Sequence, residues 1–227
     1  FGREGTLTTD FAGADDMAVA LALQPDGKII ASGWTASAGS GYDFALARYN
    51  ADGSLDQTFG EGGKVTTDFA GGDDSAYSLA LAGNRIILAG YADSSSNDFA
   101  LACYDLSGKL DPTFGLGGKV ATDFAGLDDT VRALAVLPDG KLVAAGYATS
   151  EATGMDFALA RYNKDGSLDA TFGASGQITT SFSKGEDLAF ALKVMPNGKL
   201  IAAGCAHAIH RDNQANDDFG LACYNAD

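Results

Sequence analysis

Residues 119–162, "KVATDFAGLDDTVRALAVLPDGKLVAAGYATSEATGMDFALARY", hold four short apolar runs that are separated by turns. The turn at Pro138–Lys141 places Asp-Gly between two apolar runs, which is a strong signal for a β-hairpin because Gly readily adopts the positive φ that such a turn needs. The runs do not show the periodicity of an amphipathic helix. This stretch therefore predicts four short antiparallel strands.

The same pattern returns along the whole chain, and each copy begins near a Phe-Gly pair. The pairs are Phe1-Gly2, Phe59-Gly60, Phe114-Gly115 and Phe172-Gly173. They divide residues 1–227 into repeat units of about 1–58, 59–113, 114–171 and 172–227. Four short strands in each unit match the blade of a β-propeller better than a sandwich. The sequence thus predicts an all-β fold, a single β-propeller domain with four blades of four antiparallel strands each.

The two ends of the chain are unequal. Residues 6–11, "TLTTDF", repeat the run that forms the outermost strand of a blade, whereas the fourth copy stops after residues 218–225 without such a run. One spare strand and one missing strand predict that the N-terminal strand completes the fourth blade and closes the ring. Two alternatives stay open: the chain is a fragment of a longer array, or two chains share a larger ring.

The stretch Leu110–Asp169, which contains "LDPTFGLGGKVATDFAGLDD" and "MDFALARYNKDGSLD", resembles the delta-60 repeat, a tandem bacterial repeat regarded as β-propeller-like. The resemblance covers essentially the whole chain. It implies a secreted or cell-surface bacterial protein, and it brings no established activity or catalytic residues. The fourth copy departs from the pattern at Ser181, Ser183, Lys184 and Glu186.

The chain is acidic, with a formal net charge of -15. This charge argues against nucleic acids and anionic membrane surfaces as partners, because both attract clusters of Lys and Arg. No apolar run approaches the length of a transmembrane segment. The three cysteines, Cys103, Cys205 and Cys223, lack CxxC spacing. Their pattern therefore argues against a zinc site and against a disulfide framework.

One position in the "DFALARY" run alternates between copies. It holds Arg48, Cys103, Arg161 and Cys223 in turn, so copies one and three resemble each other there, as do copies two and four. We expect each Arg to pair with a carboxylate between blades, because a buried guanidinium needs a partner.

A paired carboxylate follows the Phe-x-Gly turn of each copy. The pairs are Asp15/Asp16, Asp73/Asp74, Asp128/Asp129 and Glu186/Asp187. If they lie where the chain enters the innermost strands, they form an acidic ring at the mouth of a central channel, and Ca²⁺ takes six or more oxygen ligands. The candidate metal ligands are Asp16, Asp74, Asp129 and Asp187, with Ca²⁺ as the candidate cofactor. The alternative is that each pair binds nearby backbone N–H groups and only shapes a turn.

The loop between the second and third strands of each unit varies in length and, in an antiparallel blade, lies at the same end as the paired carboxylates. The loops are residues 34–42, 91–97, 147–155 and 205–217. Aromatic side chains beside polar groups suit peptide or sugar surfaces. The candidate ligand-binding residues are Trp34, Tyr42, Tyr91 and Tyr147, and the fourth loop adds His207 and His210 as candidates for ligand binding or an acid–base role.

The sequence shows neither the order of a Ser–His–Asp triad nor a Cys–His pair with supporting context, so we predict no catalytic residue. It favours a non-catalytic binding or scaffold propeller that presents its variable loops to a protein or glycan partner, with homo-oligomers left open. The alternative is a small metal-dependent hydrolase, lactonase-like or esterase-like. It would use the acidic loops at the channel mouth and the His-bearing fourth loop.

Overall fold

The computed structural model describes residues 1–11, 13–209 and 215–225. Within these ranges the chain forms fifteen β-strands in four antiparallel sheets, and no helix. Nor does this part of the chain contain a helix that is long and apolar enough to cross a membrane. The prediction of an all-β fold is confirmed.

Each sheet is one blade, and its strands follow one another in chain order. Blade 1 contains β1 (Asp16–Leu23), β2 (Ile29–Ser37), β3 (Gly41–Tyr49) and β4 (Lys64–Thr67). Blade 2 contains β5 (Asp74–Ala82), β6 (Arg85–Asp93), β7 (Asn97–Asp105) and β8 (Lys119–Thr122). Blade 3 contains β9 (Asp129–Val136), β10 (Leu142–Ser150), β11 (Gly154–Tyr162) and β12 (Gln177–Thr180). Blade 4 contains β13 (Leu188–Val194), β14 (Leu200–Ile209) and β15 (Ala215–Tyr224).

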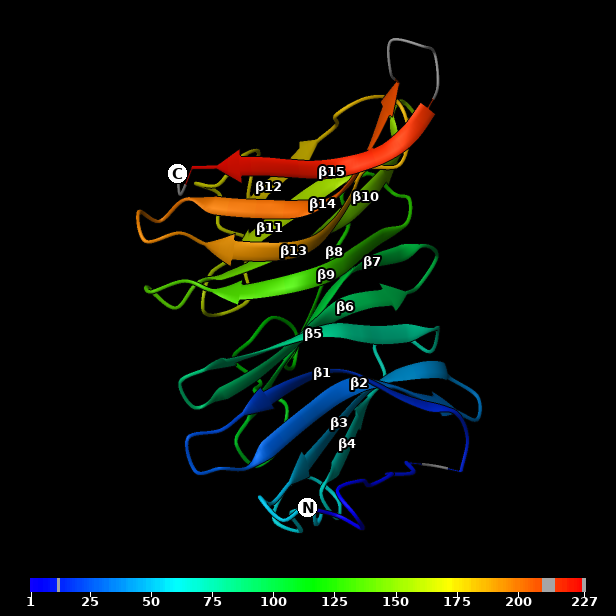
Figure 1. The fold of residues 1–227 in the computed structure, drawn as a ribbon, viewed down its shortest axis with the longest axis vertical. Helices are drawn as coiled ribbons and strands as arrows, with labels where there is room; N and C mark the ends of the chain where they lie inside the picture. Colours follow the sequence, from blue (N-terminus) through cyan, green and yellow to red (C-terminus); the bar gives the residue numbers. More distant parts are fainter. Residues whose placement is uncertain (12, 210–214, 226–227) are drawn as a thin grey trace.

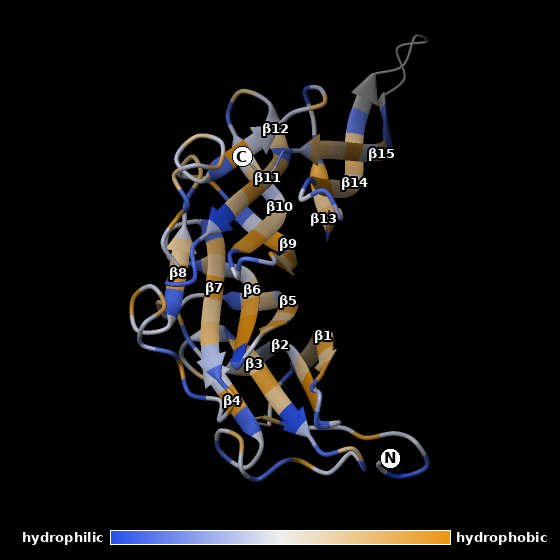
Figure 2. Ribbon diagram, turned by 90° about the vertical axis from the view of Figure 1, so that its left-hand side faces the viewer, coloured by the Kyte–Doolittle hydropathy of each residue, from blue (hydrophilic) through white to orange (hydrophobic). Residues whose placement is uncertain are grey.

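The blades are arranged as a curved fan (Figures 1 and 2). The innermost strands β1, β5, β9 and β13 lie side by side, and each contacts the next. Figure 2 shows these strands along the concave side, whereas the outer strands β4, β8 and β12 spread apart on the convex side. Blades 1 and 4 form the two ends of the fan.

A glycine near the middle of each second strand lets the innermost strand approach closely. In blade 1 the register of β1 on β2 shifts between Ala18 and Ala20, which is a β-bulge. At the bulge the carbonyl oxygen of Met17 points at Gly33, so that a Cβ on this residue would overlap it. Only glycine fits such a close backbone approach. The same overlap would occur at three further glycines: Gly90, Gly146 and Gly204.

Three apolar cores lie between consecutive blades, and they are built from equivalent residues of the repeats. The leucine of the "DFALARY" run is one example. Leu46 lies in the core between blades 1 and 2, Leu101 in the next and Leu159 in the third. All three side chains are at most 1% exposed. Apolar burial between blades is therefore the main force that holds the array together.

A buried ion pair in blades 1 and 3 accounts for the alternation of Arg and Cys. Arg48 Nε donates to Asp56 Oδ2 at 2.7 Å, and Arg161 Nε donates to Asp169 Oδ2 at the same distance. Cys103 replaces the Arg in blade 2, where Asp111 pairs instead with Arg85 at 2.9 Å. The smaller side chain leaves a hollow of about 520 Å³ beside Cys103.

The predicted closure of the ring by the N-terminal strand is wrong. The fourth sheet has three strands, and β15 lacks an outer partner among the described residues. Residues 1–11, which we call the N-terminal segment, pack instead on blade 1, where the Tyr49 hydroxyl donates to Thr9 Oγ1 at 2.8 Å. They form no strand, because a strand needs a neighbouring edge and blade 1 presents its face there.

Candidate functional site

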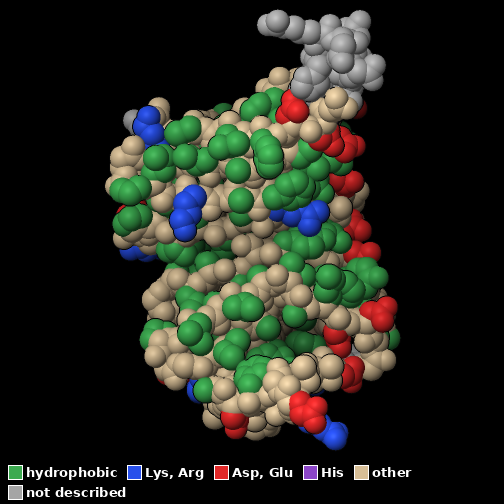
Figure 3. All heavy atoms as spheres, in the orientation of Figure 1, with side chains coloured by type: hydrophobic (Ala, Val, Ile, Leu, Met, Phe, Trp, Pro, Cys, Tyr) green, Lys and Arg blue, Asp and Glu red, His purple; other side chains and the backbone are tan. Residues whose placement is uncertain are grey.

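The paired carboxylates and the variable loops lie at the same end of the fan, as predicted. Asp73 Oδ1 accepts a hydrogen bond from the Tyr42 backbone N–H at 3.0 Å. Asp128 Oδ1 accepts one from Asn97 N–H at 3.0 Å. At these two junctions the first Asp of the pair thus ties its turn to the loop of the preceding blade. Figure 3 shows acidic side chains in a row down the edge where the innermost strands begin.

The second carboxylate of each pair closes its own turn. Asp74 Oδ2 accepts a hydrogen bond from Phe69 N–H at 2.6 Å, and Asp129 Oδ2 accepts one from Phe124 N–H at 2.8 Å. Asp187 does the same for Phe182, at 2.7 Å. These three carboxyl groups are fully buried at the junctions between blades. This geometry agrees with the interpretation of the motif as a repeated turn.

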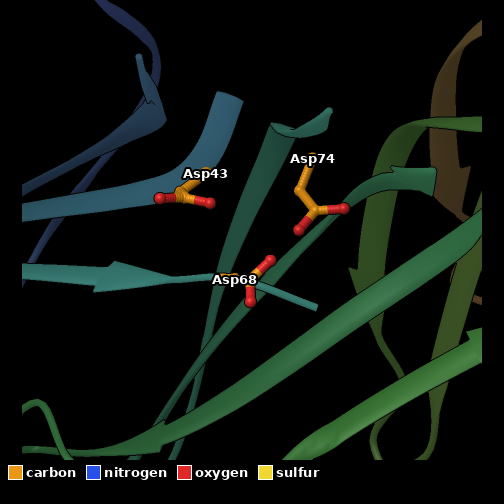
Figure 4. A group of neighbouring side chains, drawn as sticks. All are labelled: Asp43, Asp68 and Asp74. Atoms are coloured by element: carbon orange, nitrogen blue, oxygen red, sulfur yellow. The ribbon is translucent and has the colours of Figure 1, made fainter. Parts of the chain in front are cut away.

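Two of the junctions also bring together three carboxylates. The first acidic triad consists of Asp43 at β3, Asp68 after β4 and Asp74 at the start of β5. One oxygen from each lies within 4.8 Å of the others, and Figure 4 shows the three groups facing a shared space. The second acidic triad has the same spacing and comprises Asp98, Asp123 and Asp129.

These triads carry unbalanced negative charge. Burial raises the pKa of Asp74 to about 6, helped by the charges of Asp68 and Asp43. Burial likewise raises the pKa of Asp129 to about 7, with Asp123 and Asp98 adding to it. Within the described ranges no Lys or Arg forms an ion pair with either triad. Carboxylates this close favour a bound cation or a proton.

Asp43 supplies an oxygen that has no hydrogen-bond partner in the described chain. The residue is 5% exposed, and its Oδ1 atom is buried without a partner. Its other oxygen accepts only from the Ser40 hydroxyl, at 3.2 Å. An unpaired buried carboxylate oxygen is unfavourable by several kcal/mol unless something binds it. Oxygen ligands lie about 2.3–2.6 Å from Ca²⁺, so two of them can be up to about 5 Å apart around one ion.

The sequence-predicted metal ligands are thus divided among the junctions. Asp74 belongs to the first triad and Asp129 to the second, whereas Asp16 and Asp187 belong to neither. Sequence reasoning missed Asp43, Asp98, and the two aspartates that precede the Phe-x-Gly turns, Asp68 and Asp123. The sequence did contain a signal for Asp68 and Asp123. The aspartate of the "TDF" run is replaced by Ser181 in the fourth copy, and this change marks the position as one where the copies differ in charge.

We call the end of the fan that carries the paired carboxylates and the two triads the acidic rim. Aromatic side chains lie beside it. The rings of Trp34 and Tyr42 lie 4.6 Å apart. In blade 2 the rings of Tyr77 and Tyr91 are 6.0 Å apart. The guanidinium of Arg132, from the neighbouring strand β9, lies 4.1 Å from the Tyr77 ring centre.

The same guanidinium lies 5.8 Å from the Tyr147 ring centre, so Arg132 connects the aromatic residues of blades 2 and 3. We call Tyr77, Tyr91, Arg132 and Tyr147 the aromatic–arginine cluster. Two of its members, Tyr77 and Arg132, were not predicted from the sequence. They occupy the third position after the paired carboxylates of their repeats.

Of the two predicted histidines, His207 lies near the end of β14, the middle strand of blade 4, and His210 lies outside the described residues. His207 Nδ1 is 3.3 Å from Asp217 Oδ1, and its backbone N–H donates to Asp187 Oδ1 at 2.8 Å. The acidic groups found among the described residues do not include His207.

Three segments of the chain match a family model described as "Domain of unknown function (DUF5122) beta-propeller". They are residues 24–59, 84–114 and 137–172, and each runs from the hairpin through the second and third strands to Phe-Gly. Over these segments the chain is similar to β-propeller repeats. This similarity is consistent with the propeller-like arrangement of its four antiparallel sheets.

A search of curated proteins found no match to this chain. Among solved structures, it is similar to MPT-4, a mannose phosphorylase from Leishmania mexicana in complex with phosphate ion. The sequence identity is 11% and the TM-score is 0.39. The alignment covers 91% of this chain and 62% of the phosphorylase chain, so the chain spans less than two thirds of that protein.

Proposed function

We propose that this β-propeller is a non-catalytic binding module that presents its acidic rim and the adjoining innermost strands to a protein or glycan partner. The aromatic–arginine cluster is the observation that supports this function. Its tyrosines are half-buried and held by their neighbours, so that little side-chain freedom is lost when a partner binds. Sugar rings and peptide side chains both pack on such aromatic faces.

The cluster also offers a donor. Arg132 Nε is buried and has no hydrogen-bond partner within the described chain, and a buried unpaired N–H is unfavourable. A sugar hydroxyl or a peptide carbonyl would accept from it, while rim carboxylates such as Asp73 accept from partner donors. A planar Arg flanked by tyrosines is typical of residues that dominate binding energy.

A glycan and peptide array, followed by calorimetry on the hits, tests this function. Arg132→Ala and Tyr91→Ala should each weaken binding roughly tenfold to a hundredfold, since such residues contribute about 1–3 kcal/mol. Leu116→Ala is the control, because Leu116 is 88% exposed in a connection that belongs to the opposite end of the fan. Absence of binding to either library, or an equal loss in all three variants, would contradict the proposal.

A second function, the binding of divalent cations, is supported by the unpaired buried oxygen of Asp43. We propose that each acidic triad binds one Ca²⁺ between adjacent blades, with its three carboxylates as ligands. Carboxylate oxygens are the ligands that Ca²⁺ prefers, and main-chain carbonyls and water commonly complete its coordination. A bound ion would neutralise the mutual repulsion within the triad and link the two blades.

Calorimetry with Ca²⁺ should give one site for each of the two triads within a chain, and Ca²⁺ should stabilise the fold by about 2.7 kcal/mol at a hundred times the dissociation constant. Asp68→Ser copies the natural Ser181 of the third junction and should remove one of these two sites. The reverse variant, Ser181→Asp, should add a site beside Asp156 and Asp187. Asp26→Ser, in an exposed hairpin, is the control. An unchanged melting temperature with Ca²⁺ would overturn this proposal.

A further inference from the structure

The two ends of the fan expose residues whose counterparts are packed between blades. In blade 1, Leu21 is 74% exposed and Leu23 is 67% exposed. The matching residues of blade 2, Leu79 and Leu81, pack against the core between blades 1 and 2. Together with Phe1, Phe11 and Tyr49 the two exposed leucines belong to the blade 1 end face, which contains a groove of about 470 Å³.

Blade 4 exposes residues that face the following blade in the other repeats, whereas blade 1 exposes residues that face the preceding one. Phe219 is 96% exposed and Leu221 is 62% exposed. Their counterparts in blade 2, Phe99 and Leu101, are completely buried in the core between blades 2 and 3. We call Phe219, Leu221 and Cys223 the blade 4 end face. Large apolar side chains this exposed at two defined places indicate a binding surface.

The N-terminal segment adds a second form of complementarity. Gly2 N–H donates to the Asp52 carbonyl oxygen at 2.8 Å, just as Gly60 N–H donates to Ser107 in the next repeat. The bond from Tyr49 to Thr9 likewise has its counterpart in the bond from Tyr104 to Thr67. Blade 1 therefore carries the outer segment of a blade that would precede it.

Blade 4 lacks this outer segment, since the edge of β15 has no strand partner among the described residues. Among the described residues, the blade 1 end thus carries the kind of outer segment that would fit beside β15. Figure 2 shows the two ends apart, with blades 2 and 3 between them. A second copy of the chain, placed end to end with the first, supplies both missing parts.

We propose that the blade 4 end face binds the blade 1 end face of a second copy. The N-terminal segment of that copy becomes the fourth strand beside β15, and two identical junctions close a ring of eight blades. The internal junctions predict the key contact. The Phe44–Phe69, Phe99–Phe124 and Phe157–Phe182 ring pairs lie 4.8–5.0 Å apart. The fourth pair joins Phe219 to Phe11 of the partner subunit.

The same junction would assemble a further acidic group, a consequence that rests on the proposed binding of Ca²⁺. Asp10 Oδ1 accepts from Gly13 N–H at 2.7 Å and Asp16 Oδ2 from Phe11 N–H at 3.0 Å. Asp68 and Asp74 accept the equivalent bonds in the first triad. Asp218 matches Asp43 in sequence. The apolar end faces hold the two copies together, so association requires no Ca²⁺. An ion bound by Asp10, Asp16 and the partner subunit's Asp218 would strengthen it.

Sedimentation velocity and light scattering of the 227-residue chain test the proposal, with a chelator and with Ca²⁺. We expect twice the mass of one chain in both conditions. Leu21→Lys and Leu221→Lys should each give single chains, and both sites are exposed enough to accept Lys without loss of the fold. Leu116→Lys, at an 88% exposed site outside both end faces, should keep the double mass.

Mixing the two disrupted variants distinguishes a head-to-tail contact from other arrangements. The Leu21→Lys chain keeps an intact blade 4 end face, and the Leu221→Lys chain keeps an intact blade 1 end face. One intact junction remains possible between them, because a heterologous interface uses two different surfaces. The mixture should therefore recover a 1:1 complex. A single-chain mass for the unmodified protein, or no recovery on mixing, would overturn the proposal. If Ca²⁺ proved not to bind, the mass with chelator would still decide it.

Discussion

The repeat allows one substitution to be made at a packed and at an unpacked copy of the same position. Leu101 is completely buried between blades 2 and 3, whereas Leu221, its counterpart in blade 4, is 62% exposed. Truncation of a buried Leu to Ala loses the transfer free energy of the side chain and leaves a cavity, for a total of about 3–5 kcal/mol. Leu101→Ala should lower the free energy of unfolding by that amount.

Leu221→Ala should cost far less in a single chain. Full burial of a Leu side chain is worth about 1.5–3 kcal/mol, and only about a third of this side chain is shielded from water. The expected loss is below ~1 kcal/mol, and little cavity can form at a surface that is already open. At about 2–4 °C per kcal/mol for a chain of this size, the two variants should differ in Tm by roughly 5 °C or more.

Urea unfolding at protein concentrations too low for association measures the difference. Far-UV circular dichroism follows all blades, while fluorescence of Trp34, the only tryptophan, follows blade 1. Equal losses for Leu101→Ala and Leu221→Ala would refute the reasoning, because they would place the blade 4 end face inside a packed interface of the isolated chain. At concentrations that favour the two-chain ring, the cost of Leu221→Ala should rise toward that of Leu101→Ala.

Three further outcomes are expected. Hydrogen bonds from Lys28 and Thr58 and the charge of Arg48 hold the pKa of Asp56 far below its usual range. The contribution of Asp56 to the free energy of unfolding is therefore complete at neutral pH and is lost as the pH falls below about 4. Urea titrations should show a smaller loss of stability over this pH range in Asp56→Asn. Burial raises the pKa of the Cys103 thiol to about 11, so a thiol reagent at neutral pH should modify Cys223, which is exposed in the single chain, and spare Cys103 at protein concentrations too low for association. Both copies are acidic and their junction is apolar. At ~0.15 M salt, repulsion between exposed charges is largely screened beyond about 8 Å, and higher salt shortens this distance. Sedimentation should therefore show that association strengthens as salt is raised above this concentration.

The repeat period of the sequence determines the strand order within each blade, but it does not determine whether the blades close into a ring. The hairpin at Pro138–Lys141 and the buried "DFALARY" run specify strand order within one blade, because these signals are local. Ring closure depends on the rotation between neighbouring blades, which is set by the side-chain volumes across each core between blades. No local pattern encodes that rotation, and so the prediction that residues 6–11 close the ring within one chain is wrong.

The acidic triads were missed for a related reason. Asp43, Asp68 and Asp74 come from the third strand, the end of the fourth strand and the next blade, so their proximity depends on register between blades. The paired carboxylates drew attention because they are adjacent in sequence, yet the first member of a pair binds a loop and only the second joins a triad. The triads form where neighbouring blades contact each other, and the repeat pattern alone does not reveal which residues meet at these contacts.

The third junction separates what the fold needs from what the triads add. There Ser181 stands in place of the third carboxylate, and its hydroxyl donates to the Ser183 carbonyl oxygen at 2.6 Å. The junction keeps its apolar core, its Phe157–Phe182 contact and the hydrogen bond from Tyr224 to Thr180. A hydroxyl thus suffices for the turn. The clustering of buried charge at the other two junctions is unfavourable by itself. The proposed cation would compensate this cost, which apolar packing at the junction does not.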